Sequence, residues 1–173
     1  MSIHVGIIGP SLFGKSHVGK RLSLTYWQRE RRRSIVFDTR SANWGNHSLV
    51  FTDKAKFLEA CWRYRSCAVF CDDFGDHFER DKEVTPMFTS LRHQFHQLHA
   101  MTHVWQDMLP KQRNQLGTLF LFWQTRESAE SIAREWSDSR LLESTRLPKY
   151  EFLHCRKHAD APNHIITRGR FPA

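Results

Sequence analysis

The chain has 173 residues, of which 40% are hydrophobic and 25% charged. This length is that of about one domain, and the composition excludes a disordered or fibrous protein. The formal net charge is +8 and the pI is near 9.7. Such a surface attracts polyanions such as DNA or RNA, with an anionic membrane surface as the alternative.

No apolar run approaches the roughly 20 residues that a membrane-spanning helix needs, and the N-terminus lacks the pattern of a signal peptide. We therefore expect no transmembrane segment and a cytoplasmic protein. The four cysteines are too few for a disulfide framework in a chain of this size, so we expect free thiols.

Strands and helices alternate in the patterns expected along the chain. Short β-branched or apolar runs predict strands, and apolar residues spaced by three or four positions predict helices. In chain order, we expect a strand at Ile3–Ile8, a helix at His17–Gln28, strands at Ser34–Asp38 and Ser48–Thr52, a helix at Lys54–Arg65, a strand at Cys67–Phe74, a helix at Thr85–Phe95, a weaker strand at His96–His103, a strand at Thr118–Trp123, and a helix at Glu127–Trp136.

This alternation predicts an α/β three-layer sandwich around a central, mostly parallel sheet. We expect a single domain over residues 1–173, with a core at about 3–136 and a C-terminal extension at about 137–173. Within the extension, Tyr150–Cys155 and Asn163–Thr167 suggest a terminal hairpin, followed by a basic tail. The sequence assigns no role to this extension.

The segment GPSLFGKS, from Gly9 to Ser16, has the spacing G-x-x-x-x-G-K-S of a phosphate-binding loop. It follows a predicted strand and precedes a predicted helix, which is the context that such a loop requires. Glycines let backbone N–H groups turn toward phosphates, Lys15 would reach the β and γ phosphates, and the Ser16 hydroxyl would bind Mg²⁺. The predicted nucleotide-binding residues are Gly9, Pro10, Ser11, Leu12, Phe13, Gly14, Lys15, Ser16 and His17.

Two carboxylates, Asp72 and Asp73, come at the end of a second apolar strand. By themselves they fit a plain turn or a helix cap. Beside a phosphate loop they supply what the loop lacks, because Mg²⁺ prefers hard oxygen ligands and hydrolysis needs a group that orients water. We therefore predict ATP and Mg²⁺ as ligands, with Ser16 and Asp72 at the metal and Asp73 polarising the attacking water.

The segment Leu91–Phe122 resembles the FtsK–HerA superfamily of DNA-pumping ATPases. In that superfamily an Arg leads into a strand ending in Thr-Gln, followed by a loop with Pro, an Arg and another apolar strand. The short chain and the Asp-rich strand end are most similar to the genome-packaging ATPases of icosahedral viruses with an internal membrane. The resemblance covers about residues 3–136.

The resemblance implies roles for further residues. Asp73 matches the catalytic carboxylate, which is more often Glu in the family. The polar sensor, usually Gln, falls on His103, with Gln106 close by as the alternative. The Arg that completes the site of a neighbouring subunit matches Arg92, and Arg113 and Arg126 are the other candidates.

The resemblance also implies a function, an ATPase that couples hydrolysis to moving DNA and packs a viral genome into a preformed capsid. Its partners would be DNA, held by phosphate contacts without base reading, further copies in a ring, usually a hexamer, and capsid or membrane-vertex proteins. It would act in the host cytoplasm and with the virion. Candidate DNA contacts are Lys111, Arg113, Arg168 and Arg170.

Other functions fit the same motifs. One is an export motor, which would normally carry a membrane-spanning helix. Another is a nucleotide-dependent DNA-binding switch or scaffold with little hydrolysis, and a third is a small-molecule nucleotide kinase. DNA-stimulated turnover separates these functions.

Overall fold

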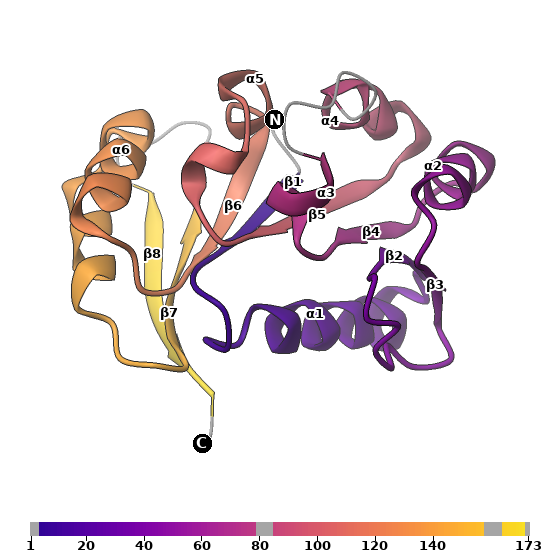
Figure 1. Ribbon diagram of the computed structural model, residues 1–173, viewed down its shortest axis with the longest axis horizontal. Coiled ribbons are helices and arrows are strands. Elements are labelled where there is room, and N and C mark those ends of the chain that lie inside the picture. The colour runs from indigo at the N-terminus through magenta and orange to yellow at the C-terminus, as the bar shows by residue number, and fades with distance from the viewer. Residues whose placement is uncertain (1–3, 79–84, 158–163, 172–173) are drawn as a thin grey trace.

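An eight-stranded sheet in the order β3-β2-β4-β5-β1-β6-β7-β8 forms the middle layer of the protein (Figure 1). The computed structural model describes residues 4–78, 85–157 and 164–171. The strands are β1 (His4–Ile8), β2 (Ser34–Phe37), β3 (Ser48–Phe51), β4 (Ala68–Cys71), β5 (Gln97–Thr102), β6 (Leu116–Leu121), β7 (Glu151–Arg156) and β8 (Ile165–Arg170).

The first six strands are all parallel, whereas β7 joins β6, and β8 joins β7, in antiparallel pairing. Strands β1, β2 and β4 are buried at every residue, which explains their continuous apolar sequences, because helices cover both of their faces. The parallel strands end at the same edge of the sheet, and this edge carries the candidate site described below.

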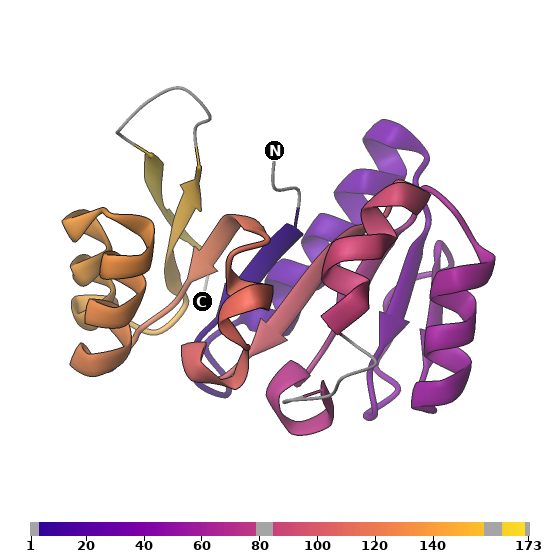
Figure 2. The same cartoon turned by 90° about the horizontal axis from the view of Figure 1, so that it is seen from above.

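Helix α1 (Lys15–Glu30) covers one face of the sheet, and the other helices cover the opposite face (Figures 1 and 2). These are α2 (Lys54–Arg63), α3 (Phe74–Phe78), α4 (Thr85–Ser90), α5 (Pro110–Arg113) and α6 (Arg126–Trp136), with 3-10 helices η1 (Leu91–Gln94), η2 (Trp105–Asp107) and η3 (Ser139–Arg146). Each face has its own apolar cluster, one under α1 around Phe70 and Phe122 and a larger one around Phe57 and Trp105. The predicted three-layer α/β architecture is confirmed.

Two sequence predictions differ from the structure in where an element ends. The strand predicted at Cys67–Phe74 ends at Cys71, because Asp73 has a left-handed φ of 48° and a helix begins at Phe74. The helix predicted over Thr85–Phe95 ends at Ser90 and tightens into η1. The weaker strand predicted at His96–His103 is confirmed as β5, which lies in the centre of the sheet between β4 and β1.

The C-terminal segment contributes η3 and the predicted hairpin, which is present as β7 and β8 and extends the sheet beyond β6. Ile3 and Asn163, where two predicted strands begin, lie outside the described residues. All four cysteines are buried free thiols, as expected. Within the described ranges, every helix is too short or too polar to cross a bilayer.

Candidate nucleotide-binding site

The predicted phosphate loop connects the end of β1 at Ile8 to the start of α1 at Lys15. Gly14 has φ of 111°, a conformation that residues with a side chain rarely adopt. A Cβ at Gly9 would collide with the side chain of Phe122, so glycine is needed there for close packing. The loop therefore ends at the N-terminus of a 16-residue helix, where unpaired N–H groups and the helix dipole favour a bound anion.

Lys15 is folded back over the loop. Its side-chain Nζ donates to the carbonyls of Gly9 at 2.8 Å and Pro10 at 3.2 Å, and to Nδ1 of His103 at 3.0 Å. Burial lowers the pKa of Lys15 to about 8, against the opposing effect of the nearby carboxylates Asp72 and Asp73. The lysine thus lies where an incoming phosphate would replace neutral acceptors with a charged one.

Ser16 and Asp72 are in direct contact, since the hydroxyl of Ser16 donates to Oδ2 of Asp72 at 3.0 Å. Asp72 is 8% exposed, and burial together with the charge of Asp73 raises its pKa, while the hydrogen bond from Ser16 opposes the rise. Adjacent hydroxyl and carboxylate oxygens form the hard donor set that Mg²⁺ prefers. These two residues therefore fit the predicted metal ion.

Asp73 lies between two cationic or protonatable side chains. Its Oδ1 is 3.2 Å from Nε2 of His103, and its Oδ2 accepts from the guanidinium of Arg40 at 3.0 Å. Because Lys15 donates to Nδ1 of His103, the ring carries its proton on Nε2 and donates to Asp73. A continuous chain of hydrogen bonds therefore runs from Lys15 through His103 and Asp73 to Arg40.

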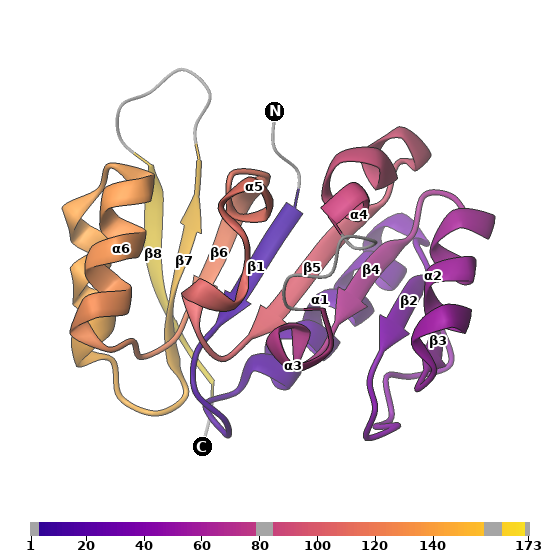
Figure 3. The same ribbon diagram turned by 45° about the horizontal axis from the view of Figure 1, so that its top comes forward.

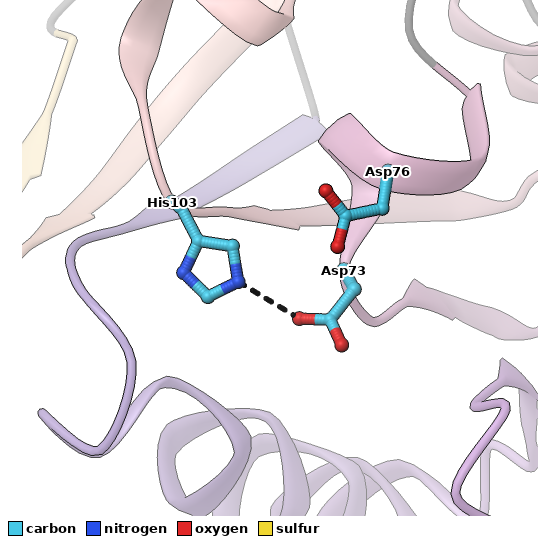
Figure 4. A group of neighbouring side chains, drawn as sticks. All are labelled: Asp73, Asp76 and His103. Atoms are coloured by element: carbon cyan, nitrogen blue, oxygen red, sulfur yellow. Dashed lines mark hydrogen bonds and ion pairs between the residues drawn. The ribbon is translucent and has the colours of Figure 1, made fainter.

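Asp76 completes a small polar cluster with Asp73 and His103 (Figure 4). One ligand atom from each residue lies within 4.8 Å of the other two. A cavity of about 240 Å³ opens beside this cluster, between the phosphate loop and the side chains of Arg40, Asp73, His103 and Tyr150. The cavity combines backbone donors, a lysine, an arginine and a carboxylate, which is the chemistry expected for a metal-bound polyphosphate.

The two candidates for the polar sensor lie in different surroundings. His103 belongs to the candidate site, between Lys15 and Asp73. Gln106, by contrast, accepts a hydrogen bond from Ser128 of α6 at 3.3 Å. The structure thus brings one of the two into contact with the site and engages the other elsewhere.

The three candidate trans arginines also differ. Arg113 is 12% exposed at its side chain, pairs with Glu135 at 3.2 Å and stacks over Trp105. Arg126 is exposed and pairs with Glu130 at 2.8 Å. Arg92 lies in η1, just before β5, at the opposite edge of the sheet from the phosphate loop, and forms no ion pair with another described residue.

Sequence reasoning misses Arg40 and Tyr150 as residues of the cavity. Arg40 follows β2, and its backbone N–H donates to Asp38, whose other oxygen accepts from the indole of Trp44. The available signal is position, because ligands of open α/β sheets bind beyond the carboxyl ends of the strands. Tyr150 carries no such signal, since it enters the site from the C-terminal hairpin.

The structure is similar to solved ATPases, while no family model and no curated protein sequence matches the chain. The DNA-packaging ATPase B204 from Sulfolobus Turreted Icosahedral Virus aligns with TM-score 0.78 and 18% identity over 99% of this chain and 98% of that one. B204 from Sulfolobus turreted icosahedral virus 2, in complex with AMPPCP, gives 0.76 and 16% over the same shares.

A third similar structure, the cytoplasmic domain of the Thermomonospora curvata type VII secretion ATPase EccC, has TM-score 0.65 and 9% identity over 99% of this chain and 24% of that one. At these identities the likeness is one of fold. The chain has the α/β fold of these P-loop ATPases, as the resemblance to the FtsK–HerA superfamily predicts.

Proposed function

We propose that the protein is an FtsK–HerA-type ATPase that uses ATP hydrolysis to move DNA, and that it packages a viral genome into a capsid. The observation that carries the proposal is the convergence of Lys15, the Ser16–Asp72 pair and the Asp73–His103 pair at one edge of the sheet. These residues come from three separate strand ends, and each has a chemical part in phosphoryl transfer.

In this proposal, ATP binds with its phosphates at the N-terminus of α1, and Lys15 leaves its carbonyl acceptors to contact them. Ser16 and Asp72 hold Mg²⁺, which when bound neutralises charge on the phosphate oxygens. Asp73 orients the attacking water, and His103 reports the state of the γ-phosphate to the strand that precedes it. Such positioning, rather than covalent chemistry, accounts for most of the catalysis in this class of reaction.

Transport of DNA is supported by two further observations. The fold matches a DNA-packaging ATPase over 99% of the chain. The net charge of +8 favours a polyanionic partner. We infer that several copies act together as a ring, usually six, in which one subunit completes the site of the next, and that capsid or membrane-vertex proteins hold the ring in place.

The experiment is to measure ATP hydrolysis by the purified protein with and without DNA, alongside Lys15→Ala and Asp73→Ala. We expect DNA to increase turnover, and each substitution to lower it by at least about 100-fold. Asp73→Ala should retain ATP binding, because Asp73 acts on water rather than on the nucleotide. Arg134→Ala, on the exposed side of α6, is the control.

Other outcomes identify the alternative functions. ATP binding without measurable turnover on any DNA would contradict the motor and favour a nucleotide-dependent switch or scaffold. Phosphate transfer to a nucleoside or nucleotide, unaffected by DNA, would favour a small-molecule kinase.

A further inference from the structure

A second charged surface lies at the edge of the sheet where the parallel strands begin. It is formed by the segments that precede β2, β4 and β5, and we call it the basic edge. Its exposed members are the arginines Arg31, Arg33, Arg63, Arg65 and Arg92 and the rings of Trp62, Tyr64 and Phe95. In Figure 3 the central parallel strands start at the upper edge of the sheet, opposite the phosphate loop.

Hydrogen bonds hold the three segments side by side. The carbonyl of Arg33 accepts from Ala68 at 3.0 Å, which joins the first segment to the second. Ser66 donates to the carbonyl of Gln94 at 2.9 Å, which joins the second to the third. Buried His96 bonds the carbonyls of Cys61 and Tyr64 through its Nε2, so the base of this surface is rigid.

The positive charge of the basic edge is not neutralised within the described part of the chain. None of its five arginines forms an ion pair with a described carboxylate. Some arginines elsewhere do so, as Arg126 with Glu130, Arg140 with Asp138 and Arg168 with Glu143 and Glu151. Five exposed arginines without an ion pair to a described carboxylate thus lie together where these three segments meet.

Two residues of the basic edge adopt backbone conformations that their side chains disfavour. Arg31 ends α1 with φ of 53°, and Phe95 ends η1 with φ of 62°. Glycine is the usual residue at such helix ends, because any side chain strains the left-handed conformation. The side chain of Phe95 is 67% exposed, so packing in the described fold does not compensate for the strain. The backbone N–H of Phe95 caps η1 on the carbonyls of Arg92 and Leu91, which glycine would do equally well, so the exposed ring is available for binding.

We propose that the basic edge binds nucleic acid, with its arginines on phosphates and its exposed rings stacked on unpaired bases. This inference rests on the proposed function, because it gives a DNA motor a contact surface separate from its nucleotide site. Arginine with interleaved aromatic side chains is the chemistry that holds single strands without reading sequence. Lys111, Arg113, Arg168 and Arg170, the contacts predicted from sequence, lie outside this surface.

The first test compares binding of fluorescently labelled oligothymidine and of a labelled duplex of equal length. Arg63→Glu/Arg65→Glu is expected to weaken binding of both at least about tenfold and to flatten the salt dependence measured between about 50 and 200 mM. The matched control is Arg134→Glu/Arg146→Glu, which changes the net charge equally at exposed arginines elsewhere. Equal losses in the two double variants would mean that bulk charge alone attracts DNA, and would overturn the proposal.

The second test uses Phe95→Gly, a substitution that relieves backbone strain. We expect the Tm to rise by about 2 °C or more while the affinity for oligothymidine falls several-fold and that for duplex changes little. If Phe95 had only a structural role, a substitution that raises the Tm would not lower the affinity for oligothymidine. Unchanged affinity for oligothymidine would contradict the proposed stacking of the exposed rings on unpaired bases.

Two controls separate this proposal from its rivals. Binding of the wild type to anionic phosphatidylserine vesicles, but to neither DNA, would overturn it in favour of a membrane surface. Lys15→Ala should lose ATP hydrolysis and keep DNA binding. If the wild type binds DNA but shows no ATPase activity, the proposed motor is contradicted and the basic edge is not. If Arg63→Glu/Arg65→Glu leaves DNA binding unchanged, the basic edge is contradicted and the motor is not.

Discussion

At the phosphate loop, short contacts link two cationic side chains, one carboxylate and one histidine. Lys15 donates to His103, His103 contacts Asp73, and Asp73 pairs with Arg40. Without a nucleotide, this arrangement gives buried Lys15 acceptors and gives Asp73 donors, so no buried charge is left uncompensated. A polyphosphate would compete for both cations, which would release the Asp73 carboxylate. Nucleotide binding and the freeing of the catalytic carboxylate are thus coupled in the proposed mechanism.

Arg40 allows a test of that coupling. Its guanidinium lines the cavity, so Arg40→Ala removes a cation from the expected position of the phosphates. We expect the Kd for ATP to rise about tenfold, which corresponds to about 1.4 kcal/mol, and the Kd for ADP to rise less. Titration with fluorescent ATP and ADP analogues measures both. Arg40→Lys should recover part of the loss, and equal weakening of ATP and ADP would argue against a contact with the terminal phosphate.

His103 and Gln106 can be separated in the same way. Because only His103 contacts Lys15 and Asp73, His103→Ala should lower kcat about 100-fold, whereas His103→Gln, which keeps a polar side chain, should lower it less. Gln106→Ala should change kcat by less than about twofold, since its amide contacts Ser128. Steady-state ATPase rates decide the matter. A large loss in Gln106→Ala with little change in His103→Ala would reverse the assignment.

Among the elements, β5 shows how histidine can belong to a buried strand. His99 is fully buried, contacts the carbonyl of Val69 through Nδ1 and the hydroxyl of Tyr26 through Nε2, and stacks on Phe70. Burial lowers the pKa of His99 from 6.5 to about 3, and the neighbouring charges of His4 and Arg32 act in the same direction. The folded protein therefore favours the neutral ring.

Because His99 is buried in this strand, we expect the protein to lose stability in acid. Below pH 6.5 His99 is protonated in the unfolded chain, whereas in the folded protein it stays neutral down to about pH 3. The free energy of unfolding therefore falls as the pH falls through this window. The contribution of this group is about 2 kcal/mol between pH 7 and pH 5. Urea unfolding of the wild type and of His99→Gln at both pH values measures it. Equal pH dependence in the two proteins would contradict the expected role of His99.

The same element explains which parts of the fold the sequence predicts. Strands with continuous apolar runs, such as β1 and β4, are recognisable because both of their faces are covered. The sequence pattern predicts β5 only weakly, because three histidines lie in or beside it. Only the structure shows the hydrogen-bond partners that make His96 and His99 compatible with burial. The end of β4 before Asp72 also depends on a local backbone conformation, that of Asp73, which spacing does not reveal.

The candidate site also has a part that the sequence predicts and a part that only the structure reveals. The phosphate loop and the carboxylate pair are contiguous motifs, so their positions could be predicted from spacing. Arg40 and Tyr150 reach the cavity from a loop after β2 and from the C-terminal hairpin, and no local pattern marks them. Their proximity depends on the strand order, which brings distant segments to one edge of the sheet.

For the whole molecule, the sheet separates two surfaces, with the phosphate loop at one edge and the basic edge at the other. The central parallel strands have four to six residues, so about 13–20 Å of backbone separates the two edges. An arginine at the basic edge does not reach its own phosphate site across this distance. Arg92 can therefore act on ATP only from a neighbouring subunit, and the other role proposed for it is contact with DNA.

Mixing experiments distinguish these two roles of Arg92. If Arg92 completes a neighbouring site, Arg92→Ala should lower DNA-free ATP hydrolysis by a factor of about 10³, because a trans arginine stabilises charge developing on the transferred phosphoryl group. Titrating Arg92→Ala into Lys15→Ala, two variants each expected to be inactive, should then restore turnover, since a mixed ring contains sites with an intact lysine and a neighbour's intact arginine. If Arg92 contacts only DNA, DNA-free hydrolysis should stay near the wild-type rate and only the DNA-stimulated part should fall. Native mass measurement of the mixtures, with and without ATP, checks that the subunits assemble, and normal assembly with neither kinetic effect would exclude Arg92 from both roles.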